Sequence, residues 1–132
     1  MTTFESKVNI ERSLSDVYRF LADFNNHIKL MPDNIQNWVS TSDEANFDIQ
    51  NMAKLSLKIT ERVEDKSIKI IATGKPPFDI TLTWNLSVHG DGTSITFTIG
   101  AALNMMMKMM ASGPLQKLAD SQTQALAKAL SA

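Results

Sequence analysis

Residues 78–99 read FDITLTWNLSVHGDGTSITFTI, and apolar residues occupy every second position on either side of a short polar turn. The alternating apolar positions are Phe78, Ile80, Leu82, Trp84, Leu86 and Val88 before the turn, and Ile95, Phe97 and Ile99 after it. A period of two over this length is typical of strands with one buried face. The connector His89-Gly90-Asp91-Gly92 suits a hairpin turn. The stretch therefore predicts an antiparallel hairpin with one apolar face and one face rich in threonine and serine.

The same alternation continues upstream. Between Ile35 and Ala101 it predicts six strands, the first of which holds Trp38. Apolar positions of the strands that follow are Phe47, Ile49, Leu55, Leu57, Ile59, Ile68, Ile70 and Ala72. Residues 4–11 alternate in the same way and predict a seventh strand. Because short connectors cannot join parallel neighbours, we expect an antiparallel sheet. A sheet with a single apolar face also needs a cover for that face.

A short helical segment follows the first strand. Ser13 and Asp16 have the spacing of a helix N-cap and the third helical residue. The apolar face of this helix consists of Val17, Phe20, Leu21 and Phe24. Asn25-Asn26 breaks the helix, and one more turn fits before Pro32 stops it.

The C-terminal segment predicts the cover. An apolar stripe at helical spacing consists of Leu115, Leu118, Ala125, Leu126, Ala129 and Leu130, and Gln122 falls within it. Pro114 fits the first turn of a helix, and methionine dominates residues 104–112 before it. We expect one long helix that is interrupted or kinked at Gly113-Pro114, or two helices in series.

The composition is that of an ordinary globular protein. The chain has 132 residues, of which 43% are hydrophobic and 20% charged, and this predicts a single domain over residues 1–132. The formal net charge of −1 disfavours a general nucleic-acid binder. The chain has no cysteine, which excludes disulfides, thiolate nucleophiles and zinc–sulfur sites. Neither a signal-peptide core nor a run of about 20 apolar residues occurs, so we expect a soluble, cytoplasmic protein without stable membrane insertion.

Residues 13–24 read SLSDVYRFLADF, and Leu30-Met31-Pro32 follows them. With the order strand, helix, short helix, six strands and long helix, this entry resembles the helix-grip fold of the START-like (SRPBCC) superfamily. That superfamily includes pollen-allergen-like proteins, polyketide cyclases and lipid-transfer domains, and the resemblance covers nearly the whole chain. It implies an α+β fold in which a curved antiparallel sheet of about seven strands wraps around a long C-terminal helix, with two short helices after the first strand. It also implies an apolar cavity with a mouth near the short helices, but no catalytic residue.

Few side chains suit catalysis. Neither His27 nor His89 has a second ligand at metal-binding spacing, so we expect no metal site and no cofactor. The acidic residues fall mostly at outward strand positions or in turns, and no pair of carboxylates converges. His27, in the short second helix, is the one candidate acid–base group.

The run Met105-Met106-Met107-Lys108-Met109-Met110 is the most unusual feature of the chain. Five methionines in six positions cannot all face one core, because a helix has 3.6 residues per turn. Three interpretations stay open. Met106 and Met110 could belong to the core, the cluster could line a ligand entrance because methionine adapts to varied apolar partners, or it could be a self-association surface.

Three functions fit these patterns. The first is non-catalytic binding or transport of a small hydrophobic molecule (a lipid, isoprenoid or polyketide) between the sheet and the C-terminal helix. Its expected lining consists of Leu57, Ile70, Leu82, Trp84, Phe97, Met107 and Met110. The second is a polyketide cyclase- or dehydratase-like enzyme assisted by His27, and the third is a homodimerising interaction domain with a filled cavity. The poor supply of reactive side chains favours the first function over an enzyme.

Overall fold

The computed structural model describes residues 1–33, 35–49, 53–74 and 79–130. Its elements in chain order are β1 (Thr2–Ile10), α1 (Leu14–Leu21), α2 (Phe24–His27), the 3-10 turn η1 (Ile28–Leu30), β2 (Ile35–Ser40), β3 (Glu44–Ile49), β4 (Ala53–Val63), β5 (Ser67–Thr73), β6 (Ile80–His89), β7 (Gly92–Ala101) and α3 (Met105–Leu130). The sequence-based fold class is confirmed: seven antiparallel strands form one sheet, two short helices follow the first strand, and a long helix comes last.

The strands pair in the order β1-β7-β6-β5-β4-β3-β2, and each pair is antiparallel. The stretch that predicts the hairpin forms β6 and β7, where Trp84 pairs with Phe97 and Leu82 with Ile99. Phe78, which begins the predicted pattern, lies outside the described residues. β1 and β7 are far apart in sequence, and their pairing joins the first strand of the chain to the last strand.

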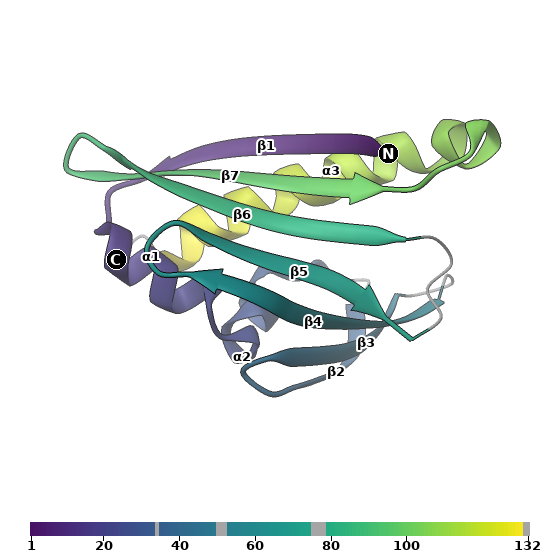
Figure 1. Ribbon diagram of the computed structural model, residues 1–132, viewed down its shortest axis with the longest axis horizontal. Coiled ribbons are helices and arrows are strands. Elements are labelled where there is room, and N and C mark those ends of the chain that lie inside the picture. The colour runs from purple at the N-terminus through teal and green to yellow at the C-terminus, as the bar shows by residue number, and fades with distance from the viewer. Residues whose placement is uncertain (34, 50–52, 75–78, 131–132) are drawn as a thin grey trace.

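Helices cover one face of the curved sheet. Figure 1 shows the sheet curling around α3, which runs along β1 and also contacts β7 and η1. The short helix α1 packs against β6 and β7 at the other end of α3. The apolar faces of the strands therefore meet α1, α2, η1 and α3, and the polar faces lie outside.

The buried side of α3 is centred on small and polar residues. Its buried positions are Ala119, Gln122, Thr123, Leu126 and Leu130. Ala129, which the pattern assigns to the apolar stripe, is exposed, and Leu115 and Leu118 are only half-buried. The contact shifts because Ala119 and Thr123 are small enough for the helix to lie close to β1.

α3 is one helix from Met105 to Leu130, and Pro114 lies inside it. At its start, the Asn104 side-chain oxygen accepts a hydrogen bond of 2.8 Å from the Met107 backbone N–H. Pro114 has no N–H, so the carbonyl of Met110 lacks its usual helical donor. Because α3 is continuous, the alternative of two helices in series is wrong. The missing hydrogen bond at Pro114 lies within this one helix.

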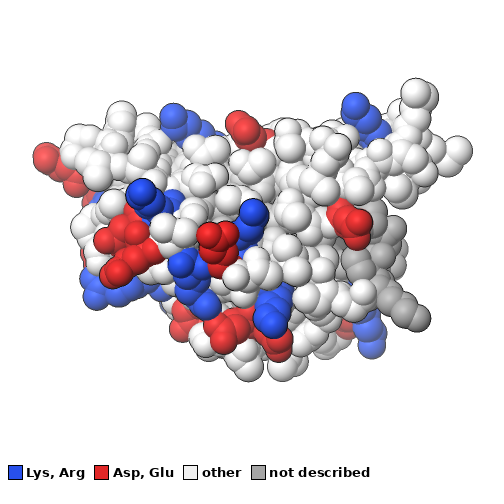
Figure 2. All heavy atoms as spheres, in the orientation of Figure 1, with Lys and Arg blue, Asp and Glu red and all other residues white. Residues whose placement is uncertain are grey.

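The first turns of α3 project beyond the end of β7 (Figure 1). Met106 and Met110 lie there and are exposed, so the interpretation that placed them in the core is wrong. The physical reason is that no described strand reaches far enough to cover these turns. Figure 2 shows this projecting end largely free of charged groups, whereas positive and negative groups mix over β4 and β5. Among the described helices, none is long and apolar enough to cross a membrane.

Candidate functional site

The candidate site is the apolar interior between the concave face of the sheet and α3. Five of the predicted lining residues lie there and are buried: Leu57, Ile70, Leu82, Trp84 and Phe97. Strand register brings them together, because Ile70 pairs with Leu82 and Trp84 pairs with Phe97. These residues come from four neighbouring strands, β4 to β7, and so form one continuous apolar surface.

The two methionines of the predicted lining lie elsewhere. Met107 is half-buried, while Met110 is 73% exposed on the projecting turns of α3. The five sheet residues are thus gathered on one surface, and the structure does not bring Met110 to it. Helical spacing alone does not reveal this difference, because it depends on where β7 ends relative to α3.

An aromatic cluster fills the middle of the interior. The rings of Trp84 and Phe97 stack with centroids 4.0 Å apart, and His27 meets Trp84 edge-on at 6.4 Å. Phe24 contacts His27 at 4.8 Å and Trp38 at 6.4 Å. Trp38 in turn stacks on Phe47 at 5.2 Å. The cluster joins α2 to β2 and β3 near one edge of the sheet and to β6 and β7 farther across it. The sequence patterns did not predict the contacts of α2.

His27 is held as a neutral group inside this cluster. Its Nε2 lies 2.7 Å from the carbonyl oxygen of Leu21, so Nε2 carries the proton and donates it. Burial lowers the pKa of His27 to about 4, although the Leu21 hydrogen bond and the Asp23 carboxylate act in the opposite direction. The ring therefore fixes α2 to the end of α1, and its Nε2 proton is already committed to the backbone.

Along β4 and β5 the interior becomes more exposed toward the end where β5 stops, whereas Ile80 and Ala101 at the same end of β6 and β7 are buried. Along β5, Ile68 and Ile70 are fully buried, whereas Ala72 is half-buried. Along β4, Leu57 is buried and Leu55 is half-buried. We call this end, which also holds the half-buried Leu103 and Leu115, the open end of the interior.

Polar side chains are scarce inside. The buried polar residues in the described part of the chain are His27, Thr93, Ser94, Gln122 and Thr123. No buried side-chain nitrogen or oxygen of the described residues lacks a hydrogen-bond partner. His27, Thr93 and Thr123 form hydrogen bonds to Leu21, Arg12 and Ser6, and the other side chains inside are mostly apolar, so the interior suits an apolar occupant.

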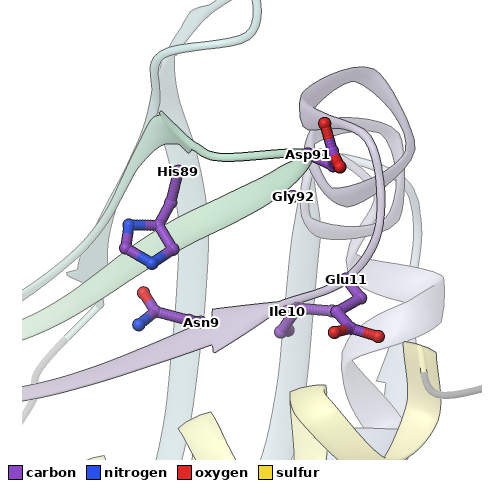
Figure 3. Close-up of a pocket in the computed structure, with 6 residues that line it drawn as sticks. All are labelled: Asn9, Ile10, Glu11, His89, Asp91 and Gly92. Atoms are coloured by element: carbon purple, nitrogen blue, oxygen red, sulfur yellow. The ribbon is translucent and has the colours of Figure 1, made fainter.

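A pocket lies at the opposite end of the sheet, beside the β6–β7 turn. Figure 3 shows the side chains of Asn9 and His89 facing one another there, while the carboxylates of Glu11 and Asp91 point in different directions. Among the described residues, no group of three or more histidine or acidic side chains could hold a metal ion. The pocket therefore offers no convergent chemistry.

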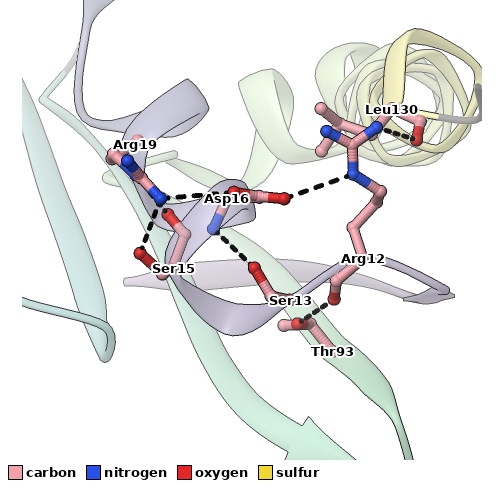
Figure 4. A network of polar contacts seen from close by, with 7 residues as sticks. All are labelled: Arg12, Ser13, Ser15, Asp16, Arg19, Thr93 and Leu130. Atoms are coloured by element: carbon pink, nitrogen blue, oxygen red, sulfur yellow. Dashed lines mark hydrogen bonds and ion pairs between the residues drawn. The ribbon is translucent and has the colours of Figure 1, made fainter.

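Polar contacts close this second end of the interior. The backbone N–H of Asp16 donates to the Ser13 hydroxyl at 3.1 Å, which confirms the predicted N-cap of α1 (Figure 4). The Arg12 guanidinium donates to the backbone carbonyl of Leu130 at 3.2 Å. The Thr93 hydroxyl donates to the backbone carbonyl of Arg12 at 2.8 Å. These contacts tie β1, β7 and the last turn of α3 together, so we call this end the closed end.

Solved structures share this architecture, although no family model and no curated protein sequence matches the chain. The Aha1 dimer from Colwellia psychrerythraea is 17% identical with a TM-score of 0.70, over 98% of this chain and 96% of that one. TTHA0849 from Thermus thermophilus is 13% identical with a TM-score of 0.75, over 99% and 100%. The KanY protein is 12% identical with a TM-score of 0.80, over 99% and 98%. At these identities the likeness shows the fold alone: the chain has a helix-grip-like fold.

Proposed function

We propose that this chain binds a small apolar molecule in the open end of the interior, without catalysing a reaction on it. The observation that carries the proposal is the change in burial along β4 and β5. Side chains at Trp84 and Phe97 are sealed, whereas equivalent positions near Leu55 and Ala72 are half-buried and still apolar. Small-molecule sites are concave and are lined predominantly by apolar side chains.

An occupant of this site would meet hydrocarbon surface on several sides. Leu82 and Leu57 supply it from the sheet, and Leu115 from α3. Burial of apolar area is favourable by about 25 cal/mol per Å², so shape and size would select the ligand more than hydrogen bonds would. Fatty acids and isoprenoids have the chemistry that this lining favours.

The geometry gives less support to an enzyme of the polyketide cyclase kind. A general base works best when its pKa lies near the working pH. The pKa of His27 is about 4, and its Nε2 proton is donated to Leu21. His27 therefore suits a structural role in the aromatic cluster better than proton transfer to a substrate.

Tryptophan fluorescence tests the proposal with palmitate, farnesol and an anthraquinone as probes. The background variant is Trp38→Phe, which preserves a ring beside Phe47 and leaves Trp84 as the only tryptophan. A probe at 100 times its Kd should change the Trp84 emission and stabilise the fold by about 2.7 kcal/mol. If no probe changes either the emission or the melting temperature, the proposal is wrong.

A further inference from the structure

Four methionines on the projecting turns of α3 are among the most exposed large apolar side chains of the described residues. The exposed fractions are 82% for Met105, 72% for Met106, 83% for Met109 and 73% for Met110. We call these four residues the methionine face. Monomeric soluble proteins rarely expose a contiguous apolar patch larger than a few hundred Å², and larger patches mark interaction sites. Their shared exposure therefore requires an account beyond packing within one chain.

Helical spacing arranges the methionine face in rows. Residues four apart lie one above the other on a helix, so Met105, Met109 and Gly113 form one row. Gly113 is exposed, and a Cβ added to it would meet nothing within 4 Å. The row thus consists of two long side chains followed by an open notch.

We propose that the methionine face binds the same face of a second copy of this chain. The two α3 helices cross in antiparallel orientation around a two-fold axis at Met109. Met105 and Gly113 are equally distant from Met109 in sequence, so Met105 of each copy lies over Gly113 of the other. Such an interface is self-complementary, as two-fold symmetry requires.

The notch favours a second copy over other partners. Glycine inside a helix costs about 1 kcal/mol relative to alanine, and neither a lipid surface nor a flat protein surface needs a notch there. The chain itself supplies a side chain that fits the notch, because Met105 lies four residues before Met109 and Gly113 lies four residues after it. Glycine also permits a close approach of another chain, because it has no Cβ.

Charge sets the strength of this contact. No acidic residue occurs between Gly92 and Ala119, and Lys108 and Lys117 are the charges in that stretch. Two copies therefore bring like charges near the rim of the interface, and salt screens their repulsion. A stable interface buries about 800 Å² per partner, which four side chains supply only in part. The dimer should accordingly be weak and should strengthen as salt rises.

Sedimentation equilibrium of the full chain measures the dissociation constant. Met109→Gln removes the apolar contact at the axis and should raise this constant at least about tenfold, which corresponds to about 1.4 kcal/mol. Gly113→Ala should also raise it by filling the notch, while the melting temperature of the dilute protein stays the same or rises, because alanine favours helix. Met1→Gln is the matched control: Met1 is 73% exposed like Met110 but lies outside α3, so the dissociation constant should not change.

Disulfide cross-linking tests the register, since the chain has no cysteine of its own. Met109→Cys should form a covalent dimer on mild oxidation. Met105→Cys and Gly113→Cys should cross-link with each other when mixed and not with themselves. The proposal is overturned if the protein stays monomeric at millimolar concentration, if Gly113→Ala leaves the dimer unchanged, or if Met105→Cys cross-links to itself. Methionine-dependent binding to phosphatidylcholine vesicles without a dimer would overturn it too and assign the face to lipid instead.

Discussion

The hydroxyl oxygens of Ser6 in β1 and Thr123 in α3 lie 2.7 Å apart, although 117 residues separate them in sequence. Thr123 donates its own proton to the carbonyl of Asp120 at 3.0 Å. The Ser6 hydroxyl is therefore the donor in the contact between the two side chains. This contact fixes the position of the helix along the first strand.

Thr123→Val should destabilise the fold by about 1–3 kcal/mol, because it keeps the side-chain shape and leaves the Ser6 hydroxyl without its acceptor. The double variant Ser6→Ala/Thr123→Val should recover part of this loss, since neither partner is then unsatisfied. Urea denaturation of the two single variants and the double variant measures the coupling. Strictly additive effects would show that the two hydroxyls do not interact.

The pH dependence of stability should report His27. Its pKa is about 4 in the folded state and near 6.5 when unfolded, so the unfolded chain binds more protons between these values. Stability should therefore be fully present above pH 6.5 and fall by up to about 3 kcal/mol as the pH drops to 4. Comparison with His27→Gln, whose amide can still donate to Leu21, isolates this contribution. Parallel pH profiles of the two proteins would contradict it.

Leu82 and Leu86 form a matched pair for testing where a ligand binds. Both lie on the concave face of β6 and both are 8% exposed, but Leu82 is nearer the open end and Leu86 nearer the closed end. Each change to alanine should cost about 2–5 kcal/mol of stability. Only Leu82→Ala should alter the affinity for a probe that binds the wild type. Equal changes in affinity would place the site elsewhere.

Arg62 fastens the β2–β3 turn to the end of α1. Its guanidinium donates to the carbonyls of Ala22 and Ser42, both at 2.9 Å, and lies 2.7 Å from the Asp43 carboxylate. Arg62→Ala should cost about 1–3 kcal/mol, because two backbone acceptors lose a charged donor. Asp43→Ala should cost less than about 1 kcal/mol, since the Asp43 side chain is 59% exposed. Thermal unfolding checks the order, and a larger effect of Asp43→Ala would contradict it.

The sheet could be predicted from the sequence because alternation and turn length are local properties. The hairpin around His89-Gly90-Asp91-Gly92 and the N-cap at Ser13 lie where the pattern placed them. Strand alternation also identified the buried face, since Trp84 and Phe97 point inward as expected. A period of two carries this information without any knowledge of tertiary contacts.

The details of α3 could not be predicted in the same way. Which side of a helix is buried depends on the partner, and Ala119 and Thr123 are buried because β1 lies close to them. The exposure of Met106 and Met110 depends on where the sheet ends. His27 could be placed in the second helix, but its contacts with Trp84 and Leu21 join separate elements of the fold, which no local pattern records.

The pairing of β1 with β7 has a consequence for synthesis of the chain. Residues 2–10 of the first strand pair with residues 93–101, so this strand has no partner until most of the chain has been made. Ribosomes add about 5–20 residues per second, and the first strand therefore waits roughly 5–20 s for its neighbour. All seven strands can pair only after this delay, and α3 is made after them. Folding of this domain is accordingly expected to occur late in its synthesis and to be governed by contacts of long sequence separation.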